Sequence, residues 1–122
     1  MKSVLIVEDD KNQRLLYEQE LALEGYGVLT AANGKEALDK VQEMHPDIII
    51  MDINMPEMDG LEAIGRIIGK YKEAPIIIHT AYSHYKESFM SWAADGYVVK
   101  SSDLAELKET IDALLTRKST AV

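Results

Sequence analysis

The sequence predicts an α/β protein with a doubly wound (βα)5 fold, in which helices cover both faces of a parallel five-stranded sheet. Short apolar runs alternate with longer amphipathic stretches, the pattern of repeated strand–helix units. Residues 48–50 and 76–78 are uninterrupted isoleucine runs, as expected for strands that are buried on both faces. The 122 residues fit one core, and we expect a single domain over residues 1–122.

The apolar runs mark the strands, and the first amphipathic stretch marks a helix. The predicted strands are residues 2–7, 27–31, 47–52, 75–80 and 96–100. The first helix is expected over residues 12–24, with Gly25 at the position of a helix-ending glycine. The apolar residues on or near one face of this helix are Leu16, Tyr17, Leu21 and Leu23.

Capping patterns mark the starts of two further helices. Asn33 can cap the second helix while Glu36 reaches back toward it, and Pro46 is expected to stop this helix. Asp103 and Glu106 have the same spacing at the start of the fifth helix. The polar end of the chain, residues 116–122, is expected to fray.

The third and fourth helices are predicted between the later strands, at residues 61–70 and about 84–94. The third helix contains Gly65 and Gly69, each of which costs about 1 kcal/mol relative to alanine. We therefore expect it to be the least stable of the five helices.

Composition and charge exclude several classes of function. The chain has 13 Lys and Arg against 21 Asp and Glu, and its net charge of -8 argues against direct binding to nucleic acid or an anionic membrane. The absence of cysteine excludes a disulfide framework and a zinc–thiolate site. No apolar run is long enough for a signal peptide or a membrane span. We expect a cytoplasmic protein whose partners are proteins or cations.

Polar and charged residues end four of the predicted strands. Glu8 and Asp9 follow the first strand, whereas Asp52, Thr80 and Lys100 close the third, fourth and fifth. In open α/β sheets the functional crevice lies beyond the carboxyl ends of the strands. These five side chains are therefore expected to meet at one edge of the sheet.

This group of residues is suited to phosphoryl chemistry with magnesium. Carboxylates that lie close together repel, and a hard divalent cation such as Mg²⁺ relieves that repulsion through oxygen ligands. A carboxylate beside such a cation can act as a nucleophile and form an acyl phosphate. Asp52 is placed for that role, while Lys100 and Thr80 can contact phosphoryl oxygens.

In these features the chain resembles the response-regulator receiver domains of bacterial two-component signalling. The matching segments are residues 4–10, Arg14, and residues 33–38, 47–60, 75–77, 80–81 and 95–100. Each segment is a weak signal alone, but their order and spacing are highly specific. The resemblance extends from residue 2 to about residue 116 and implies the strand order 2-1-3-4-5.

The resemblance also implies the metal and phosphate-accepting residues. Asp52 would be the phosphoacceptor, modified to 4-aspartylphosphate, and one of the Mg²⁺ ligands. Asp9 would bind the metal directly, Glu8 would act through water, and the backbone carbonyl of Asn54 would be a further ligand. Arg14 fixes the alignment that makes Glu8 and Asp9 the acidic pair, and Asp10, which follows them, would be a loop acid.

The remaining implied roles concern the phosphoryl contact and the response to it. Lys100 would contact the phosphoryl group, Thr80 would be the switch hydroxyl, and Tyr97 the switch aromatic residue. The chain would accept its phosphoryl group from a sensor histidine kinase or a histidine phosphotransfer protein. It would catalyse only its own phosphotransfer and slow dephosphorylation. The surface formed by the fourth helix, fifth strand and fifth helix would then control an unknown output protein or domain.

Two residues depart from the family pattern. Ser101 follows Lys100 where the family usually has proline, so we predict that the peptide bond at this point is trans or, if cis, is held by the active-site loop at a cost in free energy. His79 stands before Thr80 where the family usually has an aliphatic residue, and we expect it to be a core histidine with its hydrogen bonds satisfied.

Two other functions compete with this interpretation. A Mg²⁺-dependent phosphatase of the haloacid dehalogenase type also uses an aspartate nucleophile after a parallel strand. That group places a second aspartate two residues later, where this chain has Asn54. The other alternative is a receiver-like adaptor that is never phosphorylated, although every residue needed for transfer is present.

Overall fold

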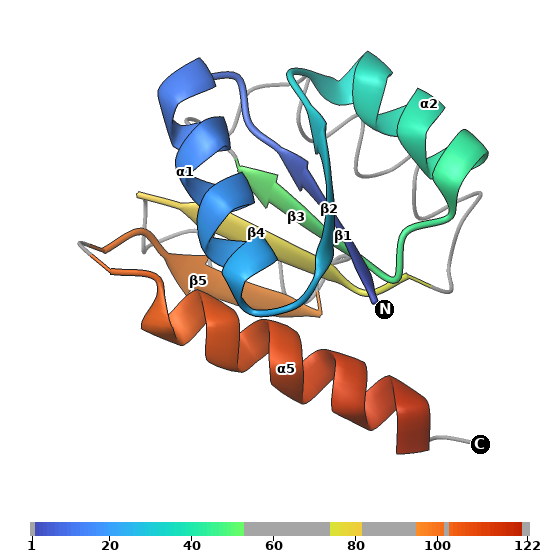
Figure 1. The fold of residues 1–122 in the computed structure, drawn as a ribbon, viewed down its shortest axis with the longest axis vertical. Coiled ribbons are helices and arrows are strands. Elements are labelled where there is room, and N and C mark those ends of the chain that lie inside the picture. Colours follow the sequence, from blue (N-terminus) through green and yellow to red (C-terminus); the bar gives the residue numbers. More distant parts are fainter. Residues whose placement is uncertain (1, 53–73, 82–94, 102, 121–122) are drawn as a thin grey trace.

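A five-stranded parallel sheet forms the centre of the protein (Figure 1). The structure, a computed structural model, describes residues 2–52, 74–81, 95–101 and 103–120. The strands are β1 (Ser3–Val7), β2 (Gly27–Ala31), β3 (Ile48–Asp52), β4 (Ile76–Thr80) and β5 (Gly96–Val99). Their order is β2-β1-β3-β4-β5, which confirms the predicted fold and strand order. Every strand lies within one residue of its predicted bounds.

Helices cover both faces of this sheet (Figure 1). Strand residues that point to one face pack against α2 (Gly34–Met44), whereas their neighbours pack against α1 (Lys11–Leu23) and α5 (Ala105–Thr120). The isoleucines of β3 and β4 are therefore buried on both faces, which explains their lack of polar alternation. Fully burying one such side chain contributes about 1.5–3 kcal/mol.

The first helix, α1, is fixed at both ends by local interactions. The Asp10 carboxylate accepts hydrogen bonds from the backbone N–H groups of Asn12 (2.9 Å) and Gln13 (3.1 Å), so Asp10 caps the helix and is not a simple loop acid. Gly25 follows the helix with φ of 95°, a conformation that glycine adopts without strain.

The predicted apolar face of α1 is only half correct. Tyr17 and Leu21 are buried, but Leu16 is 50% exposed and Leu23 is 81% exposed. Residues 17 and 21 are one helical turn apart and share a face, whereas residue 23 is turned about 200° from residue 21. Leu23 therefore points away from the sheet.

The second helix, α2, begins as the sequence predicts. Asn33 Oδ1 accepts a hydrogen bond from the Glu36 N–H (2.9 Å), and the Glu36 carboxylate reaches back to the Ala32 N–H (3.2 Å). His45 ends the helix in the left-handed conformation, with φ of 48° and an exposed side chain. The predicted caps and the end before Pro46 are confirmed.

The last helix, α5, lies against β5 and next to α1 (Figure 1). The Asp103 carboxylate accepts a hydrogen bond from the Ala105 N–H (3.0 Å) at its start. Lys108 Nζ lies 3.4 Å from Glu20 Oε1 and 3.3 Å from Glu24 Oε1, which links α5 to α1. The helix continues to Thr120 and so includes part of the segment 116–122, whose fraying stays a prediction.

Several predictions lie outside the described residues. These are the helices at residues 61–70 and 84–94 and the metal ligand Asn54.

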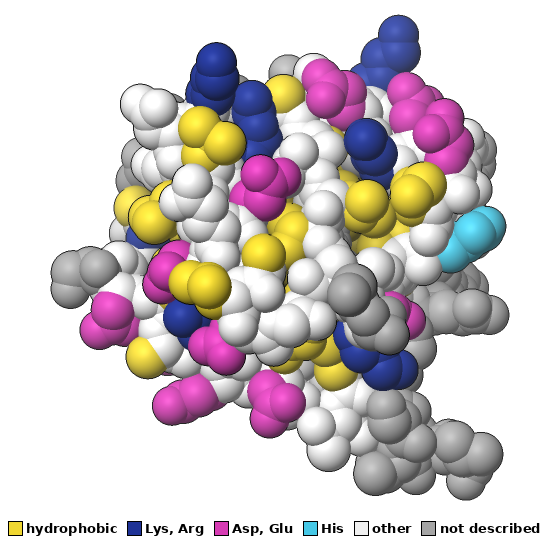
Figure 2. Space-filling view, viewed as in Figure 1, with side chains coloured by type: hydrophobic (Ala, Val, Ile, Leu, Met, Phe, Trp, Pro, Cys, Tyr) yellow, Lys and Arg dark blue, Asp and Glu magenta, His cyan; other side chains and the backbone are white. Residues whose placement is uncertain are grey.

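In the described ranges, no helix is both long enough and apolar enough to cross a membrane. Figure 2 shows that, on one face of the protein, Lys and Arg side chains are dispersed among Asp and Glu side chains.

Gly96 permits close packing of β5 against α5, which leads to a testable prediction. A Cβ atom at this position would lie 3.1 Å from Thr110 Cγ2 and 3.4 Å from Ile77 Cγ1. The Thr110 hydroxyl donates a hydrogen bond to the Glu106 carbonyl (2.8 Å), which fixes its side chain. We expect Gly96→Ala to lower the free energy of unfolding by about 1–3 kcal/mol, measured by urea denaturation.

A second substitution controls for the cause of that loss. Thr110→Ser removes the Cγ2 atom and keeps the hydroxyl, so it should restore most of the stability lost in Gly96→Ala. Equal stability of the wild type and Gly96→Ala would contradict the proposed packing constraint.

Candidate functional site

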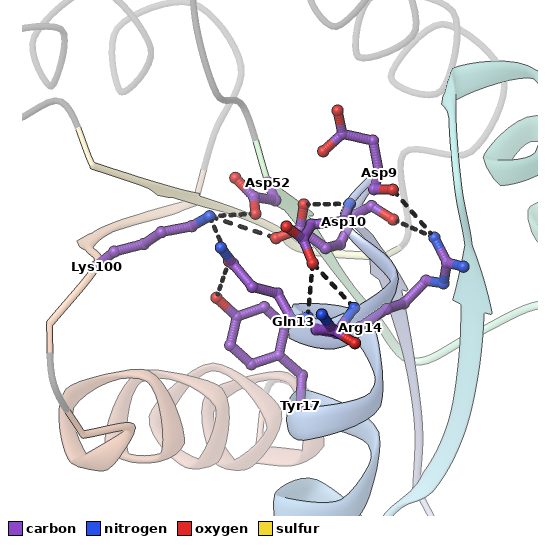
Figure 3. A network of polar contacts seen from close by, with 9 residues as sticks. Asp9, Asp10, Gln13, Arg14, Tyr17, Asp52 and Lys100 are labelled. Carbon is purple, nitrogen blue, oxygen red and sulfur yellow. Dashed lines mark hydrogen bonds and ion pairs between the residues drawn. The ribbon is translucent and has the colours of Figure 1, made fainter.

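The Lys100 ammonium group is the centre of a polar network at the carboxyl end of the sheet (Figure 3). Lys100 Nζ lies 2.5 Å from Asp52 Oδ2, 3.3 Å from Glu8 Oε1 and 2.7 Å from Gln13 Oε1. The Lys100 side chain is 17% exposed, and those of Asp52 and Glu8 are 1% and 0% exposed. An ammonium group has three donors, and each has an acceptor here.

The Asp52 carboxylate is buried and only partly satisfied. Its Oδ2 atom pairs with Lys100, but Oδ1 is buried with no hydrogen-bond partner among the described residues. Burial raises the pKa of the Asp52 carboxyl above its ordinary value, while the hydrogen bond and the positive charge of Lys100 act in the opposite direction. Asp52 therefore presents one carboxylate oxygen that can accept a further ligand.

The other two acids occupy different positions around this site. The Glu8 carboxylate is buried and also accepts a hydrogen bond from the Asp10 N–H (3.1 Å). Asp9 is exposed, and Figure 3 shows its carboxylate directed away from Lys100. Arg14 Nη1 donates to the backbone carbonyls of Glu8 (2.8 Å) and Asp9 (3.5 Å), so it holds the backbone that carries both acids.

The positions of the three acids and Lys100 can be compared with what the predicted metal site requires. In the described part of the chain, no three His, Asp or Glu side chains form a ready-made metal site. The Lys100 ammonium group lies between Glu8 and Asp52 and offsets their charge. The donor atoms are all oxygens, and Asp52 Oδ1, which has no partner in the described segments, is the kind of ligand that Mg²⁺ prefers. The residues therefore fit a hard divalent cation.

Thr80 and Tyr97 lie on the two strands beside β3. Thr80 ends β4 and is 2% exposed, and its carbonyl accepts a hydrogen bond from the Lys100 N–H (2.7 Å). Tyr97 lies on β5, is half-buried and packs against the core on the α2 face of the sheet. The described residues contain no cis peptide bond, which confirms the predicted trans bond between Lys100 and Ser101.

His79 is a buried titratable residue next to the site. It is 2% exposed, pairs in register with Asp52 across β3 and β4, and its ring centroid lies 5.3 Å from that of Tyr17. Its Nδ1 atom has no hydrogen-bond partner in the described ranges. Burial, together with the charge of Lys100, lowers the pKa of His79 from 6.5 to about 4. The predicted core position is confirmed, but the expected hydrogen bonding of the ring is not found at Nδ1 among the described residues.

Comparison with known proteins identifies the family. The family model for the response regulator receiver domain matches residues 4–112 of this chain. The chain belongs to the response-regulator receiver family. This confirms the resemblance that was inferred from the strand-end acids, threonine and lysine.

Curated relatives of this receiver domain are longer proteins. The chain is 41% identical to the response regulator ArlR of Staphylococcus aureus over 120 residues, which are 97% of this chain and 54% of ArlR. It is 36% identical to the regulatory protein AtoC of Escherichia coli over 118 residues, 95% of this chain and 26% of AtoC. The receiver domain therefore spans about half or a quarter of these relatives.

Solved structures have the same fold as this receiver domain. The response regulator TrrA of Thermotoga maritima, in complex with Mg²⁺-BeF, is 51% identical with a TM-score of 0.85, over 93% of this chain and 99% of TrrA. The structure of TrrA in complex with the histidine kinase ThkA gives a TM-score of 0.84, and the match covers 94% of this chain and 99% of the matched chain. A CheY-like receiver domain from Methanospirillum hungatei gives a TM-score of 0.90 at 28% sequence identity, and the match covers 100% of this chain and 99% of that domain.

The structure adds two residues to the receiver site that the sequence analysis missed. Gln13 accepts hydrogen bonds from Lys100 and from the Tyr17 hydroxyl (3.1 Å). Both residues lie on α1, one helical turn apart, and Tyr17 was predicted only as part of an apolar face. The four-residue spacing of Gln13 and Tyr17 was the available signal, because such residues are neighbours on a helix surface.

Proposed function

We propose that this receiver domain is a phosphorylation-controlled switch that accepts a phosphoryl group on Asp52. The observation that supports this function is the buried Asp52 carboxylate, which pairs with Lys100 through Oδ2 and whose Oδ1 has no partner among the residues that the structure describes. A partly satisfied carboxylate next to a fixed positive charge suits a nucleophile that must receive a highly charged group.

In the proposed reaction, an Asp52 oxygen forms a bond to phosphorus while the bond from phosphorus to the donor breaks. With a phosphohistidine donor, the bonding electron pair leaves with the imidazole nitrogen, and Asp52 becomes an acyl phosphate. Lys100 stabilises charge on the phosphoryl oxygens, and Thr80 donates a hydrogen bond to one of them. The protein contributes mainly positioning and electrostatics to this step.

Mg²⁺ is the proposed cofactor, held by Asp9, Asp52 and the Asn54 carbonyl, with Glu8 acting through water. When bound, it would neutralise negative charge on the transferring phosphoryl group. The oxygen-only donor set supports this proposal, as does the complex of the relative TrrA with Mg²⁺-BeF.

The response to phosphorylation is proposed to involve Thr80, Lys100 and Tyr97. The new phosphoryl group, with a charge of about −2, would attract Thr80 and Lys100 and bias the position of Tyr97. The output surface would include β5 and α5 together with the helix predicted at residues 84–94. Its partner is an output protein or an output domain of a longer chain, as the lengths of ArlR and AtoC suggest.

The proposed phosphoryl donor is a sensor histidine kinase or a histidine phosphotransfer protein in the cytoplasm. The complex of TrrA with the histidine kinase ThkA supports a donor of this class. The domain would catalyse only its own phosphotransfer and slow dephosphorylation, and the acidic net charge of -8 favours protein partners over nucleic acid.

The proposed function predicts modification of Asp52 by a small phosphoryl donor. Incubation with acetyl phosphate and Mg²⁺ should add one phosphoryl group, as measured by intact-protein mass spectrometry. Asp52→Asn should remove the addition, because it removes the nucleophile. Asp39→Asn, at an exposed position on α2, is the matched control and should be modified like the wild type.

Other outcomes would favour a different function. Repeated hydrolysis of acetyl phosphate without stable modification would favour a phosphatase. A complete lack of modification and hydrolysis would favour a phosphorylation-independent adaptor.

A further inference from the structure

We propose that Gln13 is a positioning residue that holds the Lys100 ammonium group in place for phosphoryl transfer. This inference rests on the proposed function and adds to it a residue of α1. Gln13 is not among the residues predicted from the strand ends. Its assignment comes from the polar network around Lys100 (Figure 3).

The contact between Gln13 and Lys100 has good hydrogen-bond geometry. Gln13 Oε1 lies 2.7 Å from Lys100 Nζ, whereas Glu8 Oε1 lies 3.3 Å from the same atom. A lysine side chain is a flexible stem, and fixing its ammonium group requires acceptors in more than one direction. Asp52 ends β3 and Glu8 directly follows β1, so both approach Lys100 from the sheet. Gln13 supplies a third acceptor from the helix α1.

Tyr17 holds the Gln13 amide in the required orientation. Its hydroxyl donates a hydrogen bond to Gln13 Oε1 (3.1 Å), and its ring is buried, with 4% exposed. Burial raises the pKa of Tyr17 above its ordinary value of 10.0, so the hydroxyl keeps the proton that it donates. The ring packs in the core between the sheet and α5, which makes it a firm support.

Gln13 can position Lys100 throughout phosphoryl transfer because its side chain is uncharged. Lys100 is already shared by two carboxylates, and Asp52 has to exchange this contact for a bond to phosphorus during transfer. A neutral acceptor keeps one proton of the ammonium group fixed while the others redirect to the phosphoryl oxygens. Without it, Glu8 and the nucleophile itself would be the only described residues whose side chains hold Lys100.

The test compares Gln13→Met with Gln19→Met. Both substitutions are on α1, and position 19 is exposed. We expect Gln13→Met to lower the maximal rate of modification by acetyl phosphate about three- to tenfold, with little change in the half-saturating donor concentration, because one hydrogen bond to a charged group is lost. Gln19→Met should behave like the wild type, and Tyr17→Phe should show a smaller loss than Gln13→Met.

A second measurement is independent of phosphorylation. The ¹⁵N signal of the Lys100 ammonium group, identified by its loss in Lys100→Arg, should be observable in the wild type because hydrogen bonding slows its proton exchange. We expect this signal to persist in Gln13→Glu, which keeps an acceptor, and to broaden or vanish in Gln13→Met.

These two measurements separate the possible failures. Equal rates and equal ammonium signals in Gln13→Met and the wild type would overturn the role of Gln13. If the wild type is not modified by acetyl phosphate, the proposed function fails, and the ammonium signal still reports whether Gln13 holds Lys100. An unchanged ammonium signal with a slower rate would also overturn the inference, because the loss would then arise elsewhere.

Discussion

Asp52→Asn is expected to raise the free energy of unfolding at neutral pH in metal-free buffer by about 1 kcal/mol, within the usual range for one buried group. Burial raises the pKa of the Asp52 carboxyl, so the folded state favours its protonated form. Stability attributable to this group is therefore present below its ordinary pKa of 3.8 and is lost as the pH rises through the higher folded value. Asparagine keeps the shape without the buried charge, and Lys100 keeps its pairing with Glu8.

Chemical denaturation of the wild type and Asp52→Asn at several pH values checks this expectation. The stability difference should grow as the pH rises from about 4, where the Asp52 carboxyl begins to ionise in the unfolded chain. Asp39→Asn, at an exposed site, should show no comparable gain. A clear loss of stability in Asp52→Asn would contradict the cost assigned to the buried carboxylate.

His79→Leu is expected to make the fold much more resistant to acid. The pKa of His79 is about 4 in the folded protein against an ordinary 6.5, so the unfolded chain binds the proton first as the pH falls. This difference removes stability between pH 6.5 and about 4, and it amounts to about 3 kcal/mol at the lower limit. Leucine does not titrate, and its burial leaves no unpaired ring nitrogen.

The measurement is the free energy of unfolding of both proteins from pH 7 to pH 4. The advantage of His79→Leu over the wild type should increase by about 3 kcal/mol across this range. His45→Asn is the control, because His45 is exposed and asparagine tolerates its left-handed conformation. Parallel stability curves for His79→Leu and the wild type would show that His79 titrates normally in the folded protein.

Much of the fold could be predicted from the sequence because its strands are unusually simple. The isoleucine runs at residues 48–50 and 76–78 are buried on both faces, so no choice of face was needed to place them. The α1 surface was harder, since Leu16 and Leu23 are apolar but exposed. Apolar identity alone does not fix which side of a helix meets the sheet.

The candidate site was predictable only where its residues end strands. Asp52 and Lys100 meet because parallel strands deliver their carboxyl ends to one edge of the sheet. Gln13 was missed because a neutral amide near the start of a helix carries no charge signal, and its role depends on where Lys100 reaches. Asp10 was missed as a helix cap for a related reason, since it follows two acids that resemble it in sequence. The role of Asn54 remains a prediction.

The link between α1 and α5 has a consequence for synthesis of the chain. Glu20 and Lys108 are 88 residues apart, so at translation rates of about 5–20 residues per second α5 is made roughly 4–18 s after α1. The α5 residues that complete the core on this face are Leu107, Ile111, Leu114 and Leu115. Until they leave the ribosome, the apolar side of β1 and β3 lacks its final cover, and the nascent chain is open to chaperones during this interval.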